Sequence, residues 1–201
     1  MLAVSHLTCQ RGERVLFQDL SFDLPDRQWL QIAGTNGAGK TSLLRILAGL
    51  SEPATGSVAW NGVPVRANRS AYHADLLYLG HQGALKEELT PLENLTLGLG
   101  MEGFATTAPA VRDALTRFGL SGRERLPVRY LSAGQRRRVL LCRLRLRPAR
   151  LWILDEPYTA LDVHAAAVLT EHLESHLAQG GSVLLTSHQS LSLAPGMCIT
   201  L

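Results

Sequence analysis

Residues 34–41 read GTNGAGKT and carry the residue types of a phosphate-binding loop. The stretch satisfies G-x-x-x-x-G-K-[ST] between an apolar run and a helical one, which favours nucleotide binding over a plain glycine-rich turn. The glycines let backbone N–H groups wrap a phosphate, and the next helix adds its positive N-terminal end. Lys40 would bridge the β- and γ-phosphates, and the Thr41 hydroxyl would hold Mg²⁺. The predicted nucleotide-binding residues are Gly34, Thr35, Asn36, Gly37, Ala38, Gly39, Lys40, Thr41 and Ser42.

Two adjacent carboxylates come directly after the apolar run 151–154. Ligands of open α/β sheets bind at the carboxyl ends of the strands. We therefore expect Asp155 to bind Mg²⁺ and Glu156 to take a proton from an attacking water, a contribution of about 10²–10⁴ in rate. The alternative is that Glu156 only caps the next segment of the chain. Pro157 favours the catalytic role, because it ends the strand and leaves both carboxylates at its mouth.

Two further polar residues come after apolar runs. Gln82 comes after LLYLG, and its amide would reach the metal ion or the water. His188 comes after SVLLTS, and its imidazole would bond the γ-phosphate or hold the water. Taken alone, a histidine after a strand is more often structural, so both predictions depend on the rest of the pattern.

Residues 131–139, LSAGQRRRV, form a second stretch of unusual composition. It contains no metal-ligand cluster and no nucleophile paired with a base. Ser132 and Gly134 lie at a bend, and three arginines open what reads as a helix.

The elements that must position these residues alternate between strand and helix. Near the N-terminus, MLAVSHLTC and VLFQDLSFDL alternate as half-buried strands, and Asn61-Gly62 between short apolar runs predicts a type I′ hairpin. The runs WLQIAG, LLYLG, LWILDEP and SVLLTS read as strands of a covered sheet. GKTSLLRILAGL reads as the helix after the loop, and residues 161–181 as a crossover helix ended by Gly180-Gly181.

Between the strands, residues 83–148 are rich in Leu and Arg with helical periodicity. We therefore expect one α/β domain over residues 1–201, with a core lobe at about 1–82 and 149–201 and an inserted helical lobe at about 83–148.

Composition indicates the compartment. No run approaches the length of a membrane-spanning helix, and the first residues lack the pattern of a signal peptide. The three cysteines are far apart and odd in number, which favours free thiols in a reducing compartment. We expect a cytoplasmic protein.

The charge distribution is uneven. Residues 83–150 hold 13 of the 20 Lys and Arg residues against six acidic ones, which a nucleic-acid, membrane or partner surface would explain. No aromatic residues are interleaved with the arginines as in a single-strand binder. We expect no direct nucleic-acid binding, and instead internal pairing for some arginines and a partner or anionic membrane surface for others.

Taken together, these motifs resemble an ABC-type ATPase domain over nearly the whole chain. The motifs are GTNGAGKT, Gln82, LSAGQ, LWILDEP, the ALD of residues 160–162 and His188, in that order. The resemblance implies a P-loop NTPase with a RecA-like core, an antiparallel β portion and a helical lobe, and a head-to-tail dimer closing over two ATP molecules. It assigns actions on the partner subunit's nucleotide to Ser132, Gly134, Gln135 and Asp162, and catalytic roles to Lys40, Gln82, Glu156 and His188.

Longer phrases resemble one branch of that family, the haem-export ATP-binding subunits of cytochrome c maturation. They are YLGHQGALKEELTPLENL, LSAGQRRRV with Ala133, and WILDEPYTALD. This branch implies integral membrane partners, a peripheral position on the cytoplasmic face of the bacterial inner membrane, and release of a haem-loaded periplasmic chaperone. Export of another small molecule or a lipid is the alternative. A soluble ABC ATPase would be expected to have two ATPase halves or coiled-coil insertions.

The sequence departs from the family pattern where an aromatic residue normally stacks on adenine. That position falls near Arg11, whose guanidinium plane would stack on the base instead. Phe17 is the other candidate, but its place in an alternating strand favours the core. No haem site is visible in the sequence: His172 and His176 are four residues apart but lack a third ligand.

Overall fold

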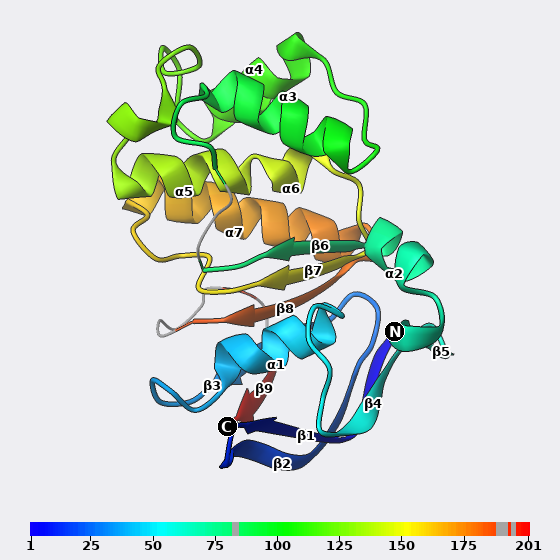
Figure 1. The fold of residues 1–201 in the computed structure, drawn as a ribbon. Coiled ribbons are helices and arrows are strands. Elements are labelled where there is room, and N and C mark those ends of the chain that lie inside the picture. Colours follow the sequence, from blue (N-terminus) through cyan, green and yellow to red (C-terminus); the bar gives the residue numbers. More distant parts are fainter. Residues whose placement is uncertain (82–84, 188–192, 194–195) are drawn as a thin grey trace. The chain divides into compact units, whose positions relative to one another are not determined.

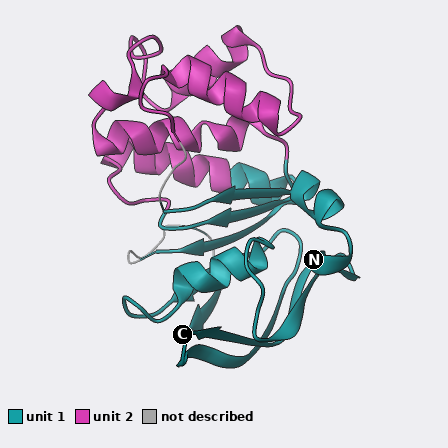
Figure 2. Cartoon of the chain, in the orientation of Figure 1, with its two compact units in different colours: residues 1–81, 149–156, 174–201 teal, residues 82–148, 157–173 magenta. Residues whose placement is uncertain are grey.

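The computed structural model describes residues 1–81, 85–187, 193 and 196–201. The chain forms two compact units, shown in two colours in Figure 2. The first unit comprises residues 1–81, 149–156 and 174–201, and the second comprises residues 82–148 and 157–173.

The first unit contains an antiparallel sheet with the strand order β2-β1-β4-β5 (Figure 1). Its strands are β1 (Leu2–Arg11), β2 (Arg14–Leu24), β4 (Thr55–Trp60) and β5 (Val63–Pro64). Between β4 and β5, Asn61 and Gly62 have φ values of 51° and 79°. Both values are positive, as a type I′ turn requires, so the hairpin predicted from Asn61-Gly62 is confirmed.

The same unit contains a parallel sheet with the order β6-β7-β8-β3-β9. Its strands are β3 (Trp29–Ala33), β6 (Leu76–Leu79), β7 (Leu151–Leu154), β8 (Ser182–Thr186) and β9 (Met197–Thr200). Every residue of β7 and β8 is buried, as their continuous apolar sequences predict. The sequence did not predict β9, because the apolar run of this edge strand, MCI, is only three residues long.

Helix α1 (Lys40–Leu47) comes after β3, and four of its residues belong to the core of the first unit. That core also takes side chains from strands of both sheets, so α1 is held by apolar contacts with each of them. Burial of this kind contributes roughly 25 cal/mol per Å² of apolar surface. A short 3₁₀ helix (Val65–Ala67) and α2 (Arg69–Asp75), which the sequence did not predict, precede β6.

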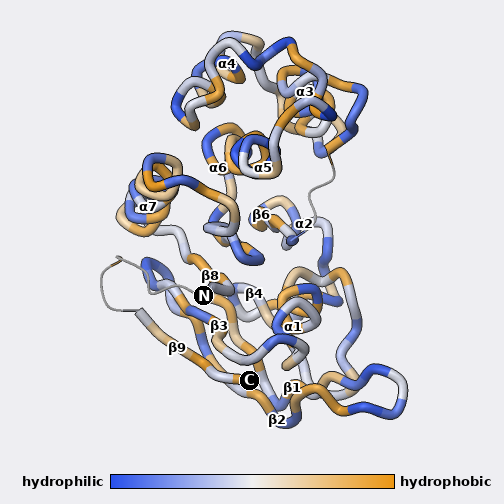
Figure 3. The backbone as a smooth tube through the Cα atoms, turned by 90° about the vertical axis from the view of Figure 1, so that its left-hand side faces the viewer, coloured by the Kyte–Doolittle hydropathy of each residue, from blue (hydrophilic) through white to orange (hydrophobic). Residues whose placement is uncertain are grey.

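The second unit is helical and has its own buried apolar residues. It contains α3 (Pro91–Met101), α4 (Ala108–Arg117), a 3₁₀ helix (Val128–Tyr130), α5 (Ala133–Leu141), α6 (Arg143–Leu146) and the first part of α7 (Val163–Ala178). Figure 3 shows hydrophobic residues recurring along these helices, and Leu95, Leu115 and Phe118 are fully or almost fully buried. None of the helices in the described ranges combines the length and apolar content needed to span a membrane.

Most arginines of the helical unit form ion pairs within it. Glu102, at the end of α3, pairs with Arg143 and with Arg147, and the Nε of Arg147 lies 2.9 Å from Glu102 Oε2. Arg147 also lies over the ring of Phe104, 4.5 Å from its centroid. The prediction of internal pairing is therefore confirmed for these arginines.

Candidate nucleotide site

The glycine-rich loop joins β3 to α1, as its motif requires. Gly34, Gly37 and Gly39 have φ values of 144°, 82° and 107°. Gly39 is also the N-cap of α1 and, being glycine, has no side chain to cap the N–H groups of the first turn. A helix N-terminus without a side-chain cap presents its N–H groups and its positive dipole end to an anion.

A side chain at Gly39 would be both strained and crowded. A Cβ atom there would lie 3.0 Å from Leu16 Cβ, on β2. The positive φ adds a conformational cost that glycine does not pay. The antiparallel sheet therefore packs directly against the loop and restricts this position to glycine.

Lys40 bends back over its own loop. Its ammonium group donates hydrogen bonds to the carbonyl oxygens of Gly34, at 2.7 Å, and Thr35, at 3.1 Å. The backbone N–H of Ala38 donates to Thr35 O at 3.2 Å and closes the loop. The charge of Lys40 is thus held inside the loop, where a phosphate would lie.

Asp155 lies immediately after β7 and is only 2% exposed. The hydroxyl of Thr41 donates to its Oδ2 at 2.9 Å, although the two residues are 114 positions apart in the chain. The hydroxyl of Thr186 donates to its Oδ1 at 2.8 Å. The structure therefore brings together Thr41 and Asp155, two of the three residues predicted to bind Mg²⁺, and the carboxylate and hydroxyl oxygens suit that ion.

Glu156 has a φ of 49°, which is unusual for a residue other than glycine. Its backbone N–H donates to Thr186 Oγ1 at 2.8 Å. The chain therefore turns sharply after Asp155. Strained backbone of this kind costs on the order of 1–3 kcal/mol and clusters at functional sites.

Sequence reasoning missed Thr186. The available signal was a hydroxyl residue after the apolar run VLL, but its pairing with Asp155 depends on the strand order, which periodicity does not show.

The negative charge of Asp155 changes the pKa of a side chain on the neighbouring strand β6. Burial and then the charge of Asp155 raise the pKa of Tyr78, while the charge of Arg45 lowers it. Tyr78 therefore remains a neutral hydroxyl near the carboxylate at physiological pH.

The signature stretch lies in the helical unit, at the start of α5. Ser132 is the N-cap: its hydroxyl accepts a hydrogen bond from Gln135 N at 3.2 Å, and Gln135 Oε1 accepts one from Ser132 N at 2.9 Å. This reciprocal capping fixes the first turn. Both side chains thus also have a local structural role.

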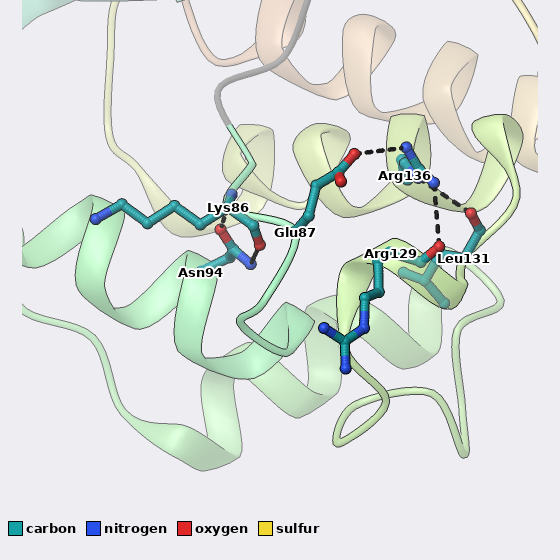
Figure 4. Close-up of polar contacts among 6 residues, drawn as sticks. All are labelled: Lys86, Glu87, Asn94, Arg129, Leu131 and Arg136. Carbon is teal, nitrogen blue, oxygen red and sulfur yellow. Dashed lines mark hydrogen bonds and ion pairs between the residues drawn. The ribbon is translucent and has the colours of Figure 1, made fainter.

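The side chain of Arg136 forms hydrogen bonds to the backbone of the segment before α5 (Figure 4). Its guanidinium donates to the carbonyl oxygens of Leu131, at 3.0 Å, and Arg129, at 3.2 Å, and lies 3.3 Å from Glu87 Oε1. The bend that presents Ser132 is therefore held by an arginine four residues further along the chain.

The ALD segment packs against the same turn. A Cβ atom on Gly134 would lie 2.4 Å from the carbonyl oxygen of Ala160. One turn along α5, Arg138 Nη1 lies 3.6 Å from Asp162 Oδ2, while Asp162 Oδ1 accepts from Ala165 N at 2.8 Å. Four residues were predicted to act on a partner's nucleotide. Three of them, Ser132, Gly134 and Gln135, thus share the first turn of α5. The fourth, Asp162, forms an ion pair with Arg138 of the same helix.

The remaining predicted site residues differ in what the structure describes of them. Gln82 and His188 fall outside the described residues. Arg11 is exposed at the end of β1, while Phe17 is 8% exposed and belongs to the core, as its alternating strand predicted.

The two histidines of α7 make ring contacts. His172 packs against Phe118, with centroids 5.2 Å apart, and His176 stacks on Trp152, with centroids 3.8 Å apart. Within the described ranges, no three metal-ligating side chains gather at one place.

A parallel sheet, a glycine-rich loop before a helix and an acidic residue closing another strand together define a P-loop NTPase. The family model described as ABC transporter matches residues 17–159. The chain belongs to the ABC transporter family, and the predicted ABC ATPase fold is confirmed.

Curated relatives are similar over almost the whole chain. A protein of Methylococcus capsulatus (strain Bath), named cytochrome c biogenesis ATP-binding export protein CcmA, is 51% identical over 96% of this chain and 93% of its own length. A protein of Escherichia coli O157:H7 with the same name is also 51% identical, over 96% of this chain and 92% of its own length. The chain is thus similar to these proteins over almost the whole length of each.

Solved structures share the fold. The ATP-binding subunit of an ABC transporter superposes with a TM-score of 0.82 at 29% identity, over 93% of this chain and 79% of that one. A dimeric ATP-binding cassette in a post-hydrolysis state, bound to ADP and Pi, superposes with a TM-score of 0.80 at 22% identity, over 94% of this chain and 88% of that one. The second likeness shows the fold alone.

Proposed function

We propose that the chain is the ATP-hydrolysing subunit of a membrane ABC complex that serves cytochrome c maturation by haem export. The observation that carries the ATPase part is the Thr41–Asp155 hydrogen bond of 2.9 Å, which places a hydroxyl and a carboxylate beside the glycine-rich loop. The biological role is supported by the names of relatives at 51% identity.

In this proposal the loop binds the phosphates of ATP through its backbone N–H groups and Lys40. Thr41 and Asp155 hold Mg²⁺, which neutralises charge on the phosphate oxygens. Glu156 accepts the proton of the attacking water, and Gln82 and His188 orient that water and the γ-phosphate. Arg11 stacks on adenine.

The signature residues act in a second subunit. Ser132, Gly134, Gln135 and Asp162 meet the nucleotide of a partner copy, so that two chains close head to tail over two ATP molecules. The dimer works with integral membrane subunits on the cytoplasmic face of the bacterial inner membrane. Hydrolysis is coupled to release of a haem-loaded periplasmic chaperone.

Two variants test the catalytic part. Glu156→Gln should bind ATP, accumulate as an ATP-dependent dimer in size-exclusion chromatography and lose turnover by about 10²-fold or more. Ser132→Arg should retain nucleotide binding as a monomer and lose hydrolysis. Undiminished turnover of Glu156→Gln would exclude Glu156 as the base, and loss of monomer binding in Ser132→Arg would exclude action in trans.

The transport part is tested by the proteins that co-purify from detergent-solubilised membranes. Recovery of integral membrane proteins together with a haem-binding periplasmic protein is the expected result. Recovery of membrane subunits whose complex exports a lipid or another small molecule would replace the haem-export assignment.

A further inference from the structure

Thr186 lies at the carboxyl end of β8, the middle strand of the parallel sheet. It is the last residue of β8, and its exposed fraction is 0%. Strand β8 lies between β7 and β3, and Thr186 pairs with Ile32 of β3. On the other side, the last pair is Leu154 with Leu185, so the next residues along, Asp155 and Thr186, face each other where the strands end. Thr186 therefore lies between the strand that leads into the loop and the strand that carries the carboxylates.

Its hydroxyl joins two consecutive residues of the candidate site. The oxygen accepts a hydrogen bond from the backbone N–H of Glu156 at 2.8 Å, and the proton is donated to Asp155 Oδ1 at 2.8 Å. A hydroxyl has one proton and two lone pairs, so both bonds form at once without competition. A bond to a carboxylate is among the stronger hydrogen bonds of proteins.

The two oxygens of Asp155 are thereby given different surroundings. Oδ1 is bound by Thr186, and Oδ2 is bound by Thr41, whose side chain lies in the first turn of the helix after the loop. A carboxylate held at one oxygen cannot turn freely about its Cβ–Cγ bond. Thr186 therefore fixes the plane of the carboxylate in which the other oxygen faces Thr41.

We propose that Thr186 is a positioning residue of the ATPase site. It orients Asp155 so that Oδ2 faces the Mg²⁺ position, and it holds the turn at Glu156, whose φ is 49°. This inference rests on the proposed function. The fit of Mg²⁺ to the site is carried by the oxygen donors of Thr41 and Asp155.

Removing the hydroxyl should weaken metal binding more than nucleotide binding. Loss of a residue that orients a metal ligand typically lowers metal affinity 10- to 100-fold. We expect Thr186→Val, which keeps the shape of the side chain, to raise the Mg²⁺ concentration for half-maximal binding of a fluorescent ATP analogue by about tenfold. Binding of the analogue in EDTA should stay within about twofold of wild type, and kcat at saturating ATP and Mg²⁺ should fall.

Two variants serve as controls. Thr186→Ser keeps the hydroxyl and should restore the Mg²⁺ dependence of wild type. Thr170→Val removes a hydroxyl that bonds Ala166 O at 3.0 Å and Tyr158 Oη at 2.9 Å in the helical unit. It should lower the thermal unfolding midpoint without changing the Mg²⁺ dependence.

A purely structural role predicts a different result. If Thr186→Val lowers the unfolding midpoint but leaves the Mg²⁺ dependence and kcat unchanged, the proposal is overturned. If Thr186→Val does not fold, Thr186→Ala takes its place, since it also removes the hydroxyl; an unchanged Mg²⁺ dependence in that variant overturns the proposal equally. Failure of the proposed function gives a separate signature, because wild-type protein would then show no Mg²⁺-dependent nucleotide binding at all.

Discussion

The first turn of α5 rests on the chain that leads into α7: a Cβ atom on Gly134 would lie 2.4 Å from the carbonyl oxygen of Ala160. The obstacle is backbone and cannot rotate away. We therefore expect Gly134→Ala to lower the free energy of unfolding by about 1–3 kcal/mol, the usual cost of overpacking. Urea unfolding measures this, and ATP hydrolysis should fall with it, because Ser132 and Asp162 flank the displaced contact.

Gly98→Ala is the matched control. Gly98 is also helical, within α3, but a Cβ atom there would have nothing within 4 Å. Alanine should stabilise that helix by up to about 1 kcal/mol. Equal losses at both glycines would show that the Ala160 contact is not the cause.

Lys40→Ala should abolish detectable ATP binding while the protein remains folded. The lysine is the cation of the loop, and its ammonium contacts only Gly34 O and Thr35 O among the bonds formed by the described residues. Isothermal titration with ATP and circular dichroism provide the two measurements. Lys86→Ala, in the helical unit, removes the other lysine of the chain and should bind ATP as wild type does. Normal binding by Lys40→Ala would remove the loop from the nucleotide site.

Glu102→Gln should destabilise the protein by about 1–3 kcal/mol, because one carboxylate serves both Arg143 and Arg147. Arg147 is 6% exposed, and burial is the main cause of its lowered pKa, so water compensates little for the lost charge. Asp113→Asn breaks a single pair with Arg145, in which both side chains are largely exposed, and should cost at most about 1 kcal/mol. Urea unfolding of the two variants gives the comparison, and a larger loss for Asp113→Asn would contradict it.

His176 should make stability depend on pH. Burial against Trp152 lowers its pKa from 6.5 to about 4. Above pH 6.5 the imidazole is neutral in both folded and unfolded chains, so it contributes no pH dependence. Between pH 6.5 and about 4, His176 binds a proton in the unfolded chain but stays neutral in the folded chain, so stability is lost as the pH falls. Below about pH 4 the imidazole is protonated in both states, and this loss of stability stops.

His176→Phe keeps a ring against Trp152 and removes the titration. Between pH 7.5 and 4.5, measured at half-unit steps, the unfolding midpoint of wild type should therefore fall further than that of the variant. Parallel curves would show that His176 takes up its proton as readily in the folded chain as in the unfolded one.

The loop, the strand before it and the helix after it were predictable from sequence, because a complete local motif specifies all three. The position of the two carboxylates was also predictable from a local pattern, because a charged pair that follows an apolar run marks the end of a strand. The role of Thr186 was not, because its partner is 31 positions away and is chosen by strand order. Helix α2 and strand β9 were missed because each is short, at seven and four residues, and neither carries a long apolar period.

The arginines of residues 136–147 show the other limit of sequence reasoning. Their number suggested a surface for a partner or a membrane, and helical periodicity alone left their partners open. In the structure Arg136, Arg138, Arg143, Arg145 and Arg147 each pair with a carboxylate of the same unit. Such pairs join residues up to 49 positions apart, which no local pattern encodes.

The interleaving of the two units constrains the order in which the chain can fold on a ribosome. The helical unit needs residues 157–173, and the other unit needs the strands after them. Domains usually fold as units while synthesis proceeds from the N-terminus. Here the helical unit is complete only when residue 173 has left the exit tunnel, and the other unit only when the strands after that residue have followed. The hydrophobic surfaces of both units are therefore exposed together late in synthesis, which favours aggregation of the nascent chain.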